Sequence, residues 1–284
     1  MQASNLLAIE VGSSRVKLGW FPGDGVCASE KPVGNLPIAA PALLEPTEVF
    51  RIEHRRGDRQ WIEEVESRLA EMDLPTETVC VLAAVHQRAA ETLRRDVLVR
   101  QNWSRIETLT RDDIAIEVDV KEPARVGIDR LLNALAVNRV RSPQRPAIVV
   151  DMGTAMTVNL ISENGVFQGG AILAGPMTAL GALHTATSSL PLLGSEVFEA
   201  PPAAVGKSTD EAMASGAYWG AVGAARQLIE RMAATCTNAP EVFLTGGAAR
   251  GLAAHVGLGE HPARHLPQLV LSGIRLAADG MLRP

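Results

Sequence analysis

The chain has 284 residues, a formal net charge of −5, and 46% hydrophobic against 21% charged residues. This length allows one large domain or two ordinary ones, each with a buried core. The acidic balance lacks the positive footprint that attracts nucleic acid, so we expect no nucleic-acid partner.

The N-terminus and the cysteines predict a cytoplasmic protein. No basic region precedes a long apolar run, and no apolar stretch reaches the roughly 20 residues of a membrane span. We therefore expect neither a signal peptide nor a membrane partner. Cys27, Cys80 and Cys236 form no CxxC pair, which is typical of small buried thiols in a reducing compartment. His261 and His265 flank Pro262 in a loop-like stretch, where we expect surface residues rather than metal ligands.

The first part of the chain shows strand and helix patterns in turn. Residues 6–20 predict two strands joined by a turn, and the proline- and alanine-rich stretch 30–47 predicts a loop that has room for one short helix. Apolar residues at helical spacing predict a helix over 58–72. The continuous apolar run 78–85 is typical of a strand inside a parallel sheet. A basic helix is expected over 87–101.

The second part repeats this alternation. A helix is predicted to begin near Gly127, with Asp129 and Arg130 in its first turn. The further expected elements are strands 147–152, 156–162, 166–172 and 241–247, and helices 176–188, 209–235 and 266–282. Strands alternating with helices predict an α/β fold with mostly parallel sheets. We expect two domains, residues 1–122 and residues 123–284.

Two stretches share one pattern: "IEVGSSRVKLG", Ile9 to Gly19, and "VDMGTAMTVNL", Val150 to Leu160. In each, a strand ends in an acid, which a glycine and hydroxyl residues follow. Glycine lets the backbone approach a ligand, and N–H and hydroxyl groups bind phosphate oxygens. An acid there would hold a hydrated divalent cation. We predict that two such hairpins clamp a polyphosphate. The alternative is a plain hairpin with a capping threonine.

Three smaller signals bear on nucleotide binding. "FLTGG", Phe243 to Gly247, would expose backbone beside a ribose and base. "GKST", residues 206–209, is not a Walker P-loop, because Pro201 stands where that motif requires glycine. No GxGxxG follows a strand, which argues against a dinucleotide site.

Asp129 and Arg130 have a structural and a functional interpretation. An acid in the first turn of a helix is stabilised by the helix dipole. Alternatively, Asp129 is a general base that accepts a proton from a substrate hydroxyl. Arg130 has the planar fork that suits a substrate carboxylate, but it equally suits a solvated surface position.

The order and sequence of these stretches resemble the type III pantothenate kinases. The matching stretches are "EVGSSRVKLG", "VGIDRLLNALAV", "DMGTAMTVN", "GGAILAGPMTALGALHTATSSLP", "VGKSTDEAMASGAYWG", "VFLTGGAA" and "LPQLVLSGIRLA". They span nearly the whole chain. The resemblance implies the acetate and sugar kinase and actin superfamily, with two ribonuclease-H-like domains and ATP in the interdomain cleft.

The resemblance also implies an activity. This is the ATP-dependent phosphorylation of pantothenate to 4′-phosphopantothenate, the first step of coenzyme A biosynthesis, by a cytoplasmic homodimer. The implied cofactors are ATP, Mg²⁺ and a monovalent cation, K⁺ or NH₄⁺. Two alternatives stay open. One is a non-catalytic pantothenate- or nucleotide-binding regulatory protein on the same fold, and the other is a kinase of another small alcohol.

Residue roles follow from the same resemblance. Asp129 would be the general base, and Arg130 would hold the pantothenate carboxylate. Asp151 matches a monovalent-cation ligand, Thr154 an ATP-phosphate contact, and Thr209 a pantothenate contact across the dimer. The substrate motif is Gly127, Ile128, Asp129 and Arg130. The first phosphate loop is Glu10, Val11, Gly12, Ser13, Ser14, Arg15, Val16 and Lys17.

The chain departs from the family pattern at four places. The first loop usually has Asp-x-Gly-Asn-Thr, whereas Glu10 begins it here and would shift a bound magnesium by one methylene. Asn159 stands where an acid is usual. The stretch Ala83 to Gln87, "AAVHQ", replaces Ser-Val-Val-Pro. The aromatic residue often found shortly before Gly-x-Asp-Arg is missing from "KEPARVGIDR".

Overall fold

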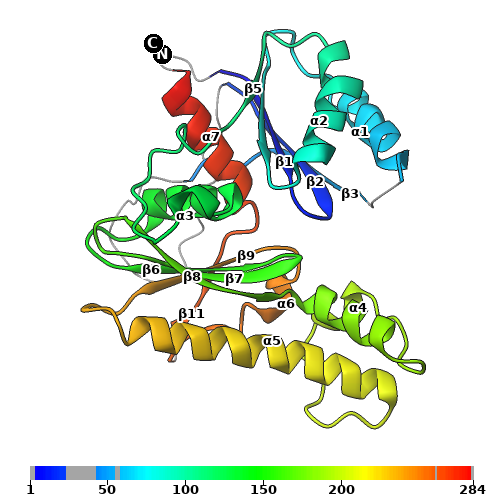
Figure 1. The fold of residues 1–284 in the computed structure, drawn as a ribbon, viewed down its shortest axis with the longest axis vertical. Helices are drawn as coiled ribbons and strands as arrows, with labels where there is room; N and C mark the ends of the chain where they lie inside the picture. The colour runs from blue at the N-terminus through cyan, green and yellow to red at the C-terminus, as the bar shows by residue number, and fades with distance from the viewer. Residues whose placement is uncertain (1–3, 24–42, 55–57, 260, 283–284) are drawn as a thin grey trace. The chain divides into compact units, whose positions relative to one another are not determined.

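The computed structural model describes residues 4–23, 43–54, 58–259 and 261–282, and they pack into two compact units (Figure 1). Unit 1 comprises Met1–Ile116, Ala124–Val140 and Gln268–Pro284, and unit 2 comprises Glu117–Pro123 and Arg141–Pro267. This division differs from the expected one at residues 122 and 123. The reason is that helices α3 (Ile128–Val140) and α7 (Leu269–Met281) contact strands of the first unit.

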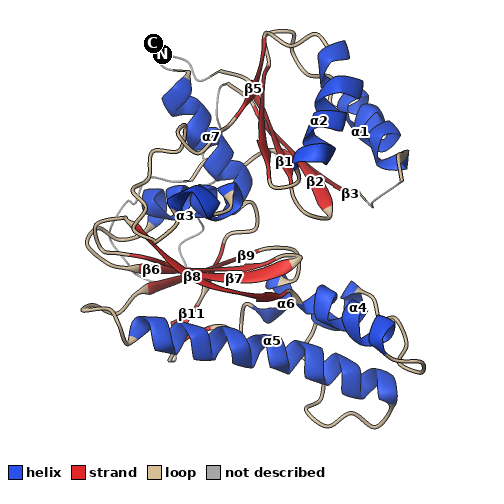
Figure 2. Ribbon diagram, in the orientation of Figure 1, coloured by secondary structure: helices blue, strands red, loops and turns tan. Residues whose placement is uncertain are grey.

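Unit 1 contains a five-stranded mixed sheet in the order β3-β2-β1-β4-β5 (Figure 2). Its strands are β1 (Leu6–Val11), β2 (Arg15–Phe21), β3 (Glu48–Glu53), β4 (Val79–Ala84) and β5 (Arg105–Thr108). Strand β1 pairs antiparallel with β2 and parallel with β4. Every residue of β1 and β4 is buried, which explains why their sequences are apolar apart from Glu10.

Helices pack against both faces of this sheet. Helices α1 (Gln60–Glu71) and α2 (Gln87–Asp96) share one core with the β1 side chains Leu7, Ile9 and Val11. Helix α7 contacts β1 and also α3, where a Cβ on Gly273 would lie 2.4 Å from the Leu132 carbonyl oxygen. Glycine is therefore required for the close approach of α3 and α7.

Unit 2 contains a second five-stranded sheet, in the order β12-β9-β6-β7-β8. Its strands are β6 (Ala147–Met152), β7 (Ala155–Ile161), β8 (Phe167–Ala174), β9 (Glu241–Thr245) and β12 (Arg264–His265). The remaining elements are α4 (Pro176–Ala186), α5 (Thr209–Ala233), α6 (Ala249–Leu252), β10 (Gly257–Leu258) and β11 (His261–Pro262). Buried side chains of β6, β7 and β9 form one core with the buried face of α5.

The two sheets repeat one topology. Strands β6, β7, β8, β9 and β12 take the places of β1, β2, β3, β4 and β5, with the same parallel and antiparallel pairings. The α/β class with two ribonuclease-H-like domains is confirmed. The prediction of mostly parallel sheets was wrong, because strands joined by a short turn must run antiparallel.

Several local predictions differ from the structure. Strands β3 and β5 were not predicted, because five of the six residues of β3 and all four of β5 are exposed or partly buried, with no clear alternation. The helix expected over 87–101 ends at Asp96 and is followed by a short 3₁₀ turn, Leu98–Arg100. Most of the loop expected over 30–47, and Cys27, lie outside the described residues. His261 is exposed, but His265 is half-buried in β12, so its surface placement was wrong.

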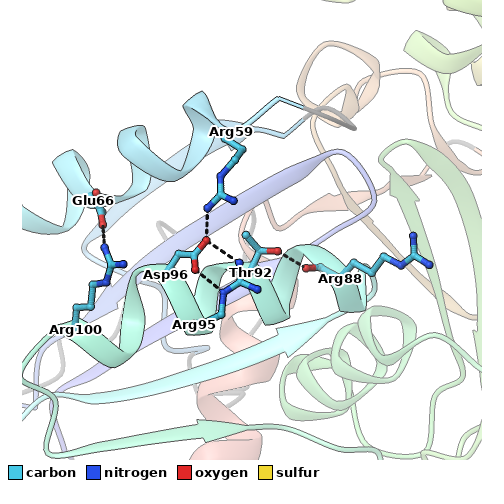
Figure 3. A network of polar contacts seen from close by, with 7 residues as sticks. All are labelled: Arg59, Glu66, Arg88, Thr92, Arg95, Asp96 and Arg100. Carbon is cyan, nitrogen blue, oxygen red and sulfur yellow. Dashed lines mark hydrogen bonds and ion pairs between the residues drawn. The ribbon is translucent and has the colours of Figure 1, made fainter.

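The basic surface of α2 is partly neutralised by acids of the same unit (Figure 3). Asp96 accepts hydrogen bonds from Arg95 and Arg59. The bond from Arg95 contributes most to lowering the pKa of Asp96 to about 2. The Arg100 guanidinium lies 3.9 Å from a Glu66 carboxylate oxygen.

In the ranges that the structure describes, no helix combines the length and apolarity of a membrane span.

Candidate active site

The first predicted phosphate loop has an ion pair at its base. Glu10 in β1 stands opposite Lys17 in β2, and the Lys17 ammonium nitrogen lies 2.7 Å from Glu10 Oε2. The glutamate is only 8% exposed, so its charge is compensated inside the protein rather than by water. A cation bound at Glu10 would therefore share this carboxylate with an ammonium group.

The turn of this hairpin is closed by main-chain bonds. The Gly12 N–H donates to the Arg15 carbonyl oxygen at 2.9 Å, and a Cβ on Gly12 would lie 3.3 Å from that oxygen. The Arg15 guanidinium donates to Glu53 at 3.1 Å. Ser13 is exposed at the tip and Ser14 is half-buried. Exposed backbone and hydroxyl groups at such a tip are suited to bind phosphate oxygens.

Asp129 is held at the start of α3. The Arg130 N–H donates to Asp129 Oδ1 at 2.9 Å. A Cβ on Gly127 would lie 2.5 Å from the same oxygen, so only glycine leaves room for this carboxylate position. Burial, and then the negative charge of Glu10, raise the pKa of Asp129, against the lowering effect of Arg130. Asp129 is therefore more basic than an ordinary aspartate, as a proton acceptor requires.

Arg130 is also partly desolvated. Burial lowers the pKa of Arg130, while the neighbouring Asp129 carboxylate raises it. The Arg111 guanidinium donates to the Val126 carbonyl oxygen and so fixes the residue before Gly127. The sequence analysis missed Arg111, because it lies in a segment without periodicity. The only signal there is a turn, in which the Thr110 N–H donates to Asp113 at 2.7 Å.

The second hairpin has a different base. Asp151 in β6 stands opposite Thr157, whose hydroxyl oxygen accepts from Asn159 Nδ2 at 3.0 Å. Gly246 has φ +101°, and a Cβ there would lie 2.6 Å from Asp151 Oδ1 and 2.5 Å from the Met152 nitrogen. A Cβ on Gly153 would lie 3.5 Å from the same carboxylate oxygen. The main chain at Gly246 therefore approaches the Asp151 carboxylate so closely that no side chain fits at this position.

Thr154 lies at the tip of the second hairpin. Its carbonyl oxygen accepts from the Gly175 N–H at 3.0 Å and from the Thr178 hydroxyl at 2.6 Å. The start of α4 thus fixes the main chain of this tip. The Thr154 residue itself is exposed, in a position suited to a phosphate contact.

Thr209 is the exposed first residue of α5. Ser208 caps the helix by accepting from the Glu211 N–H at 3.2 Å, and Glu211 accepts from the Lys207 N–H at 2.6 Å. The "GKST" stretch is therefore a variant of the helix capping box.

Over the described ranges, no three His, Cys, Asp or Glu side chains gather as a metal-binding group.

The predicted site residues thus fall into two sets. Unit 1 brings together Glu10, Lys17 and Asp129, since Glu10 and Asp129 interact electrostatically although they are far apart in the sequence. Unit 2 brings together Asp151 and Gly246. The sequence analysis also missed His54 and His86, which contact the first loop.

Comparison with known proteins identifies the family. The family model described as type III pantothenate kinase matches residues 6–231. The chain is 37% identical over 201 residues to the type III pantothenate kinase of Acidiphilium cryptum, covering 70% of this chain and 71% of that protein. For the Thermus thermophilus enzyme of the same name, the identity is 30% over 249 residues, covering 87% and 89%. For that of Gluconobacter oxydans, the identity is 40% over 169 residues, and the match spans only 60% of each chain.

Solved structures show more distant similarities. The activator of the 2-hydroxyisocaproyl-CoA dehydratase from Clostridium difficile, with bound ADPNP, is similar at a TM-score of 0.49 and 12% identity, over 97% of this chain and 94% of that one. An archaeal actin homologue in complex with ADP is similar at a TM-score of 0.48 and 12% identity, over 97% and 99%. Because the family model matches most of its residues, the chain belongs to the type III pantothenate kinase family, a family of kinases.

Proposed function

We propose that this chain phosphorylates pantothenate to 4′-phosphopantothenate with ATP, and that Asp129 accepts the proton. The observation that carries the assignment of Asp129 is its position. Its carboxylate is held between Gly127 and the Arg130 N–H, and burial and Glu10 raise its pKa. Membership of the kinase family supports the choice of substrate and nucleotide.

The proposed reaction is a phosphoryl transfer. The pantothenate hydroxyl oxygen forms a bond to the γ-phosphorus of ATP, while the bond from that phosphorus to the bridging oxygen breaks and ADP leaves. Asp129 takes the hydroxyl proton as this happens. The Arg130 guanidinium would hold the pantothenate carboxylate, because its charge and planar fork match that group.

The two hairpins would bind phosphates and cations. The first loop, residues 10–17, offers the Lys17 ammonium and its turn N–H groups, and Thr154 offers a hydroxyl. Bound Mg²⁺ would neutralise charge on the β- and γ-phosphates. Asp151, whose carboxylate the main chain of Gly246 approaches closely, would be the ligand of K⁺ or NH₄⁺, as the family resemblance implies. The homodimer, the contact of Thr209 across it and the cytoplasmic location are proposals that rest on the family resemblance.

The Asp129→Asn variant tests the general base. Asparagine keeps an oxygen for the Arg130 N–H but accepts no proton, so we expect kcat to fall by about 100- to 10,000-fold. The fold should be retained. The pKa of Asp129 is raised in the folded state, so a proton bound at Asp129 stabilises the fold at low pH. This stabilisation is lost as the pH rises through that pKa. The variant should therefore melt no lower than the wild type at neutral pH.

The measurement is ADP release with ATP, Mg²⁺ and pantothenate, alongside thermal unfolding. A variant that keeps the full rate would show that Asp129 is not the base. Wild-type protein that binds pantothenate without releasing ADP would favour the regulatory alternative. Faster release with another small alcohol than with pantothenate would favour a different acceptor.

A further inference from the structure

His54 binds the first loop at two main-chain positions. It follows β3 directly and is only 8% exposed. Its N–H donates to the Ser14 carbonyl oxygen at 2.9 Å, and its ring Nε2 lies 2.9 Å from the Gly12 carbonyl oxygen. Because a carbonyl oxygen only accepts, Nε2 carries a proton and donates it. One residue thus fixes two carbonyl groups of the turn that presents Ser13.

Neighbouring rings hold the His54 ring in place. The Trp61 ring centroid lies 5.6 Å away, and the His86 ring lies edge-on at 5.2 Å and 79°. His86 is itself fixed, because its Nδ1 accepts from the Ala89 N–H at 3.1 Å at the start of α2. The His86 N–H also donates to the Val11 carbonyl oxygen at 3.2 Å. His86 lies in the "AAVHQ" stretch that departs from the family pattern, and a proline could not make this last bond.

The direction of these bonds matters for anion binding. In a trans peptide, the C=O and the next N–H point to opposite sides. The chain contains no cis peptide among the described residues, so a Gly12 carbonyl held on His54 directs the Ser13 N–H away from His54. Without this bond the peptide could rotate and present its carbonyl oxygen, which would repel a phosphate. Donors fixed in advance bind an anion without the cost of reorienting.

We propose that His54 is a positioning residue for ATP, which holds the Gly12–Ser13 peptide so that its N–H faces a bound phosphate. The inference rests on the proposed function of the loop in ATP binding. His54 acts on the main chain and need not touch the nucleotide. His86 and Trp61 act one step further away, by keeping the imidazole in register with the Gly12 carbonyl.

Two substitutions at His54 separate the hydrogen bond from the packing. His54→Phe keeps a ring against Trp61 and His86 but removes the donor, whereas His54→Gln returns an N–H donor at a similar reach. We expect His54→Phe to raise the KM for ATP by roughly tenfold, or about 1.4 kcal/mol, and to leave the KM for pantothenate unchanged. His54→Gln should restore most of the affinity for ATP. If His54→Phe does not fold, His54→Leu provides the same comparison.

Trp61→Phe is the packing control. It disturbs the same cluster without removing the donor, so it should lower the melting temperature and raise the KM for ATP far less than His54→Phe does. An unchanged KM in His54→Phe, or an equal rise in the Phe and Gln variants, would overturn the inference. If the wild type does not turn over pantothenate, the proposed function fails. In that case the Kd for MgATP of the wild type, His54→Phe and His54→Gln, measured by calorimetry, still decides the role of His54.

Discussion

The two hairpins share a topology but differ in the residue opposite the acid. In unit 1 the partner of Glu10 is Lys17, and in unit 2 the partner of Asp151 is Thr157. The first acid is neutralised within its own hairpin by an ammonium group, at 2.7 Å. The second faces a hydroxyl across the strands, and the main chain of Gly246 approaches it closely. Two copies of one backbone arrangement therefore differ in the charge that surrounds their acid.

The hairpins also differ in what holds their turns. Four residues connect the pair Val11 and Val16, whereas three connect Met152 and Met156. The longer turn is held by its own main-chain bond between Gly12 and Arg15, by His54 and by the ion pair between Arg15 and Glu53. The shorter turn is held by close approach of main chain, since a Cβ on Gly175 would lie 1.9 Å from the Gly153 carbonyl oxygen. Substitution should therefore affect the two turns in different ways.

Gly246→Ala should have the largest effect. The residue has φ +101°, and an added Cβ would lie 2.5 Å from the Met152 nitrogen, which belongs to a buried strand. The backbone strain alone costs about 1–3 kcal/mol. We expect a lower free energy of unfolding in urea and loss of most activity, because Asp151 must also move.

The matched control is Ala84→Gly. Ala84 pairs with Val11 and so occupies in the first sheet the place that Gly246 has in the second. This change should cost only about 0.5–1 kcal/mol, from the greater backbone freedom of glycine. Equal destabilisation by the two substitutions would show that the sheets do not differ at this position.

The sequence predicts the central elements of the fold well. The first strand of the stretch 6–20 and the strands 78–85 and 147–152 were predicted because central strands are buried on both faces and need nearly continuous apolar residues. The edge strand β3 has one buried residue in six, so its pattern gives no such signal. The packing of α7 with the first sheet could not be predicted, because it joins segments from opposite ends of the chain.

The candidate site was predictable where a motif determines a local shape. Gly127 and Asp129 are one such case, since the glycine makes room for the carboxylate two residues later. The interaction of Glu10 with Asp129 depends on tertiary packing, so neither stretch alone predicts it. The contact of His54 with Gly12 depends on β3 pairing with β2 and was missed for the same reason.

Asp151→Asn should have an intermediate effect that is specific to one ligand. On the proposal that Asp151 binds the monovalent cation, removing the carboxylate charge weakens that binding, while an amide of the same shape preserves the packing against Gly246. We expect the variant to lose activation by K⁺ and to work at the rate of the wild type without K⁺, a decrease of roughly tenfold or about 1.4 kcal/mol. The measurement is ADP release against K⁺ concentration. If Asp151→Asn responds to K⁺ as the wild type does, Asp151 is not the cation ligand.

Glu10→Gln should lower stability, because Lys17 loses its buried partner, but its effect on catalysis should be the smallest and seen in the pH dependence rather than in the maximal rate. Asp129 accepts a proton only when ionised, so kcat/KM falls as the pH drops below its pKa in the free enzyme. Burial contributes most to raising this pKa, and the negative charge of Glu10 makes the next largest contribution. Removing that charge should move the acidic limb of the profile to lower pH, while burial keeps it above that of an ordinary aspartate. The control is Glu53→Gln, which removes an exposed acid of the same unit and should leave the acidic limb of the pH profile in place. The same shift in both variants would mean that Glu10 has no specific influence on Asp129.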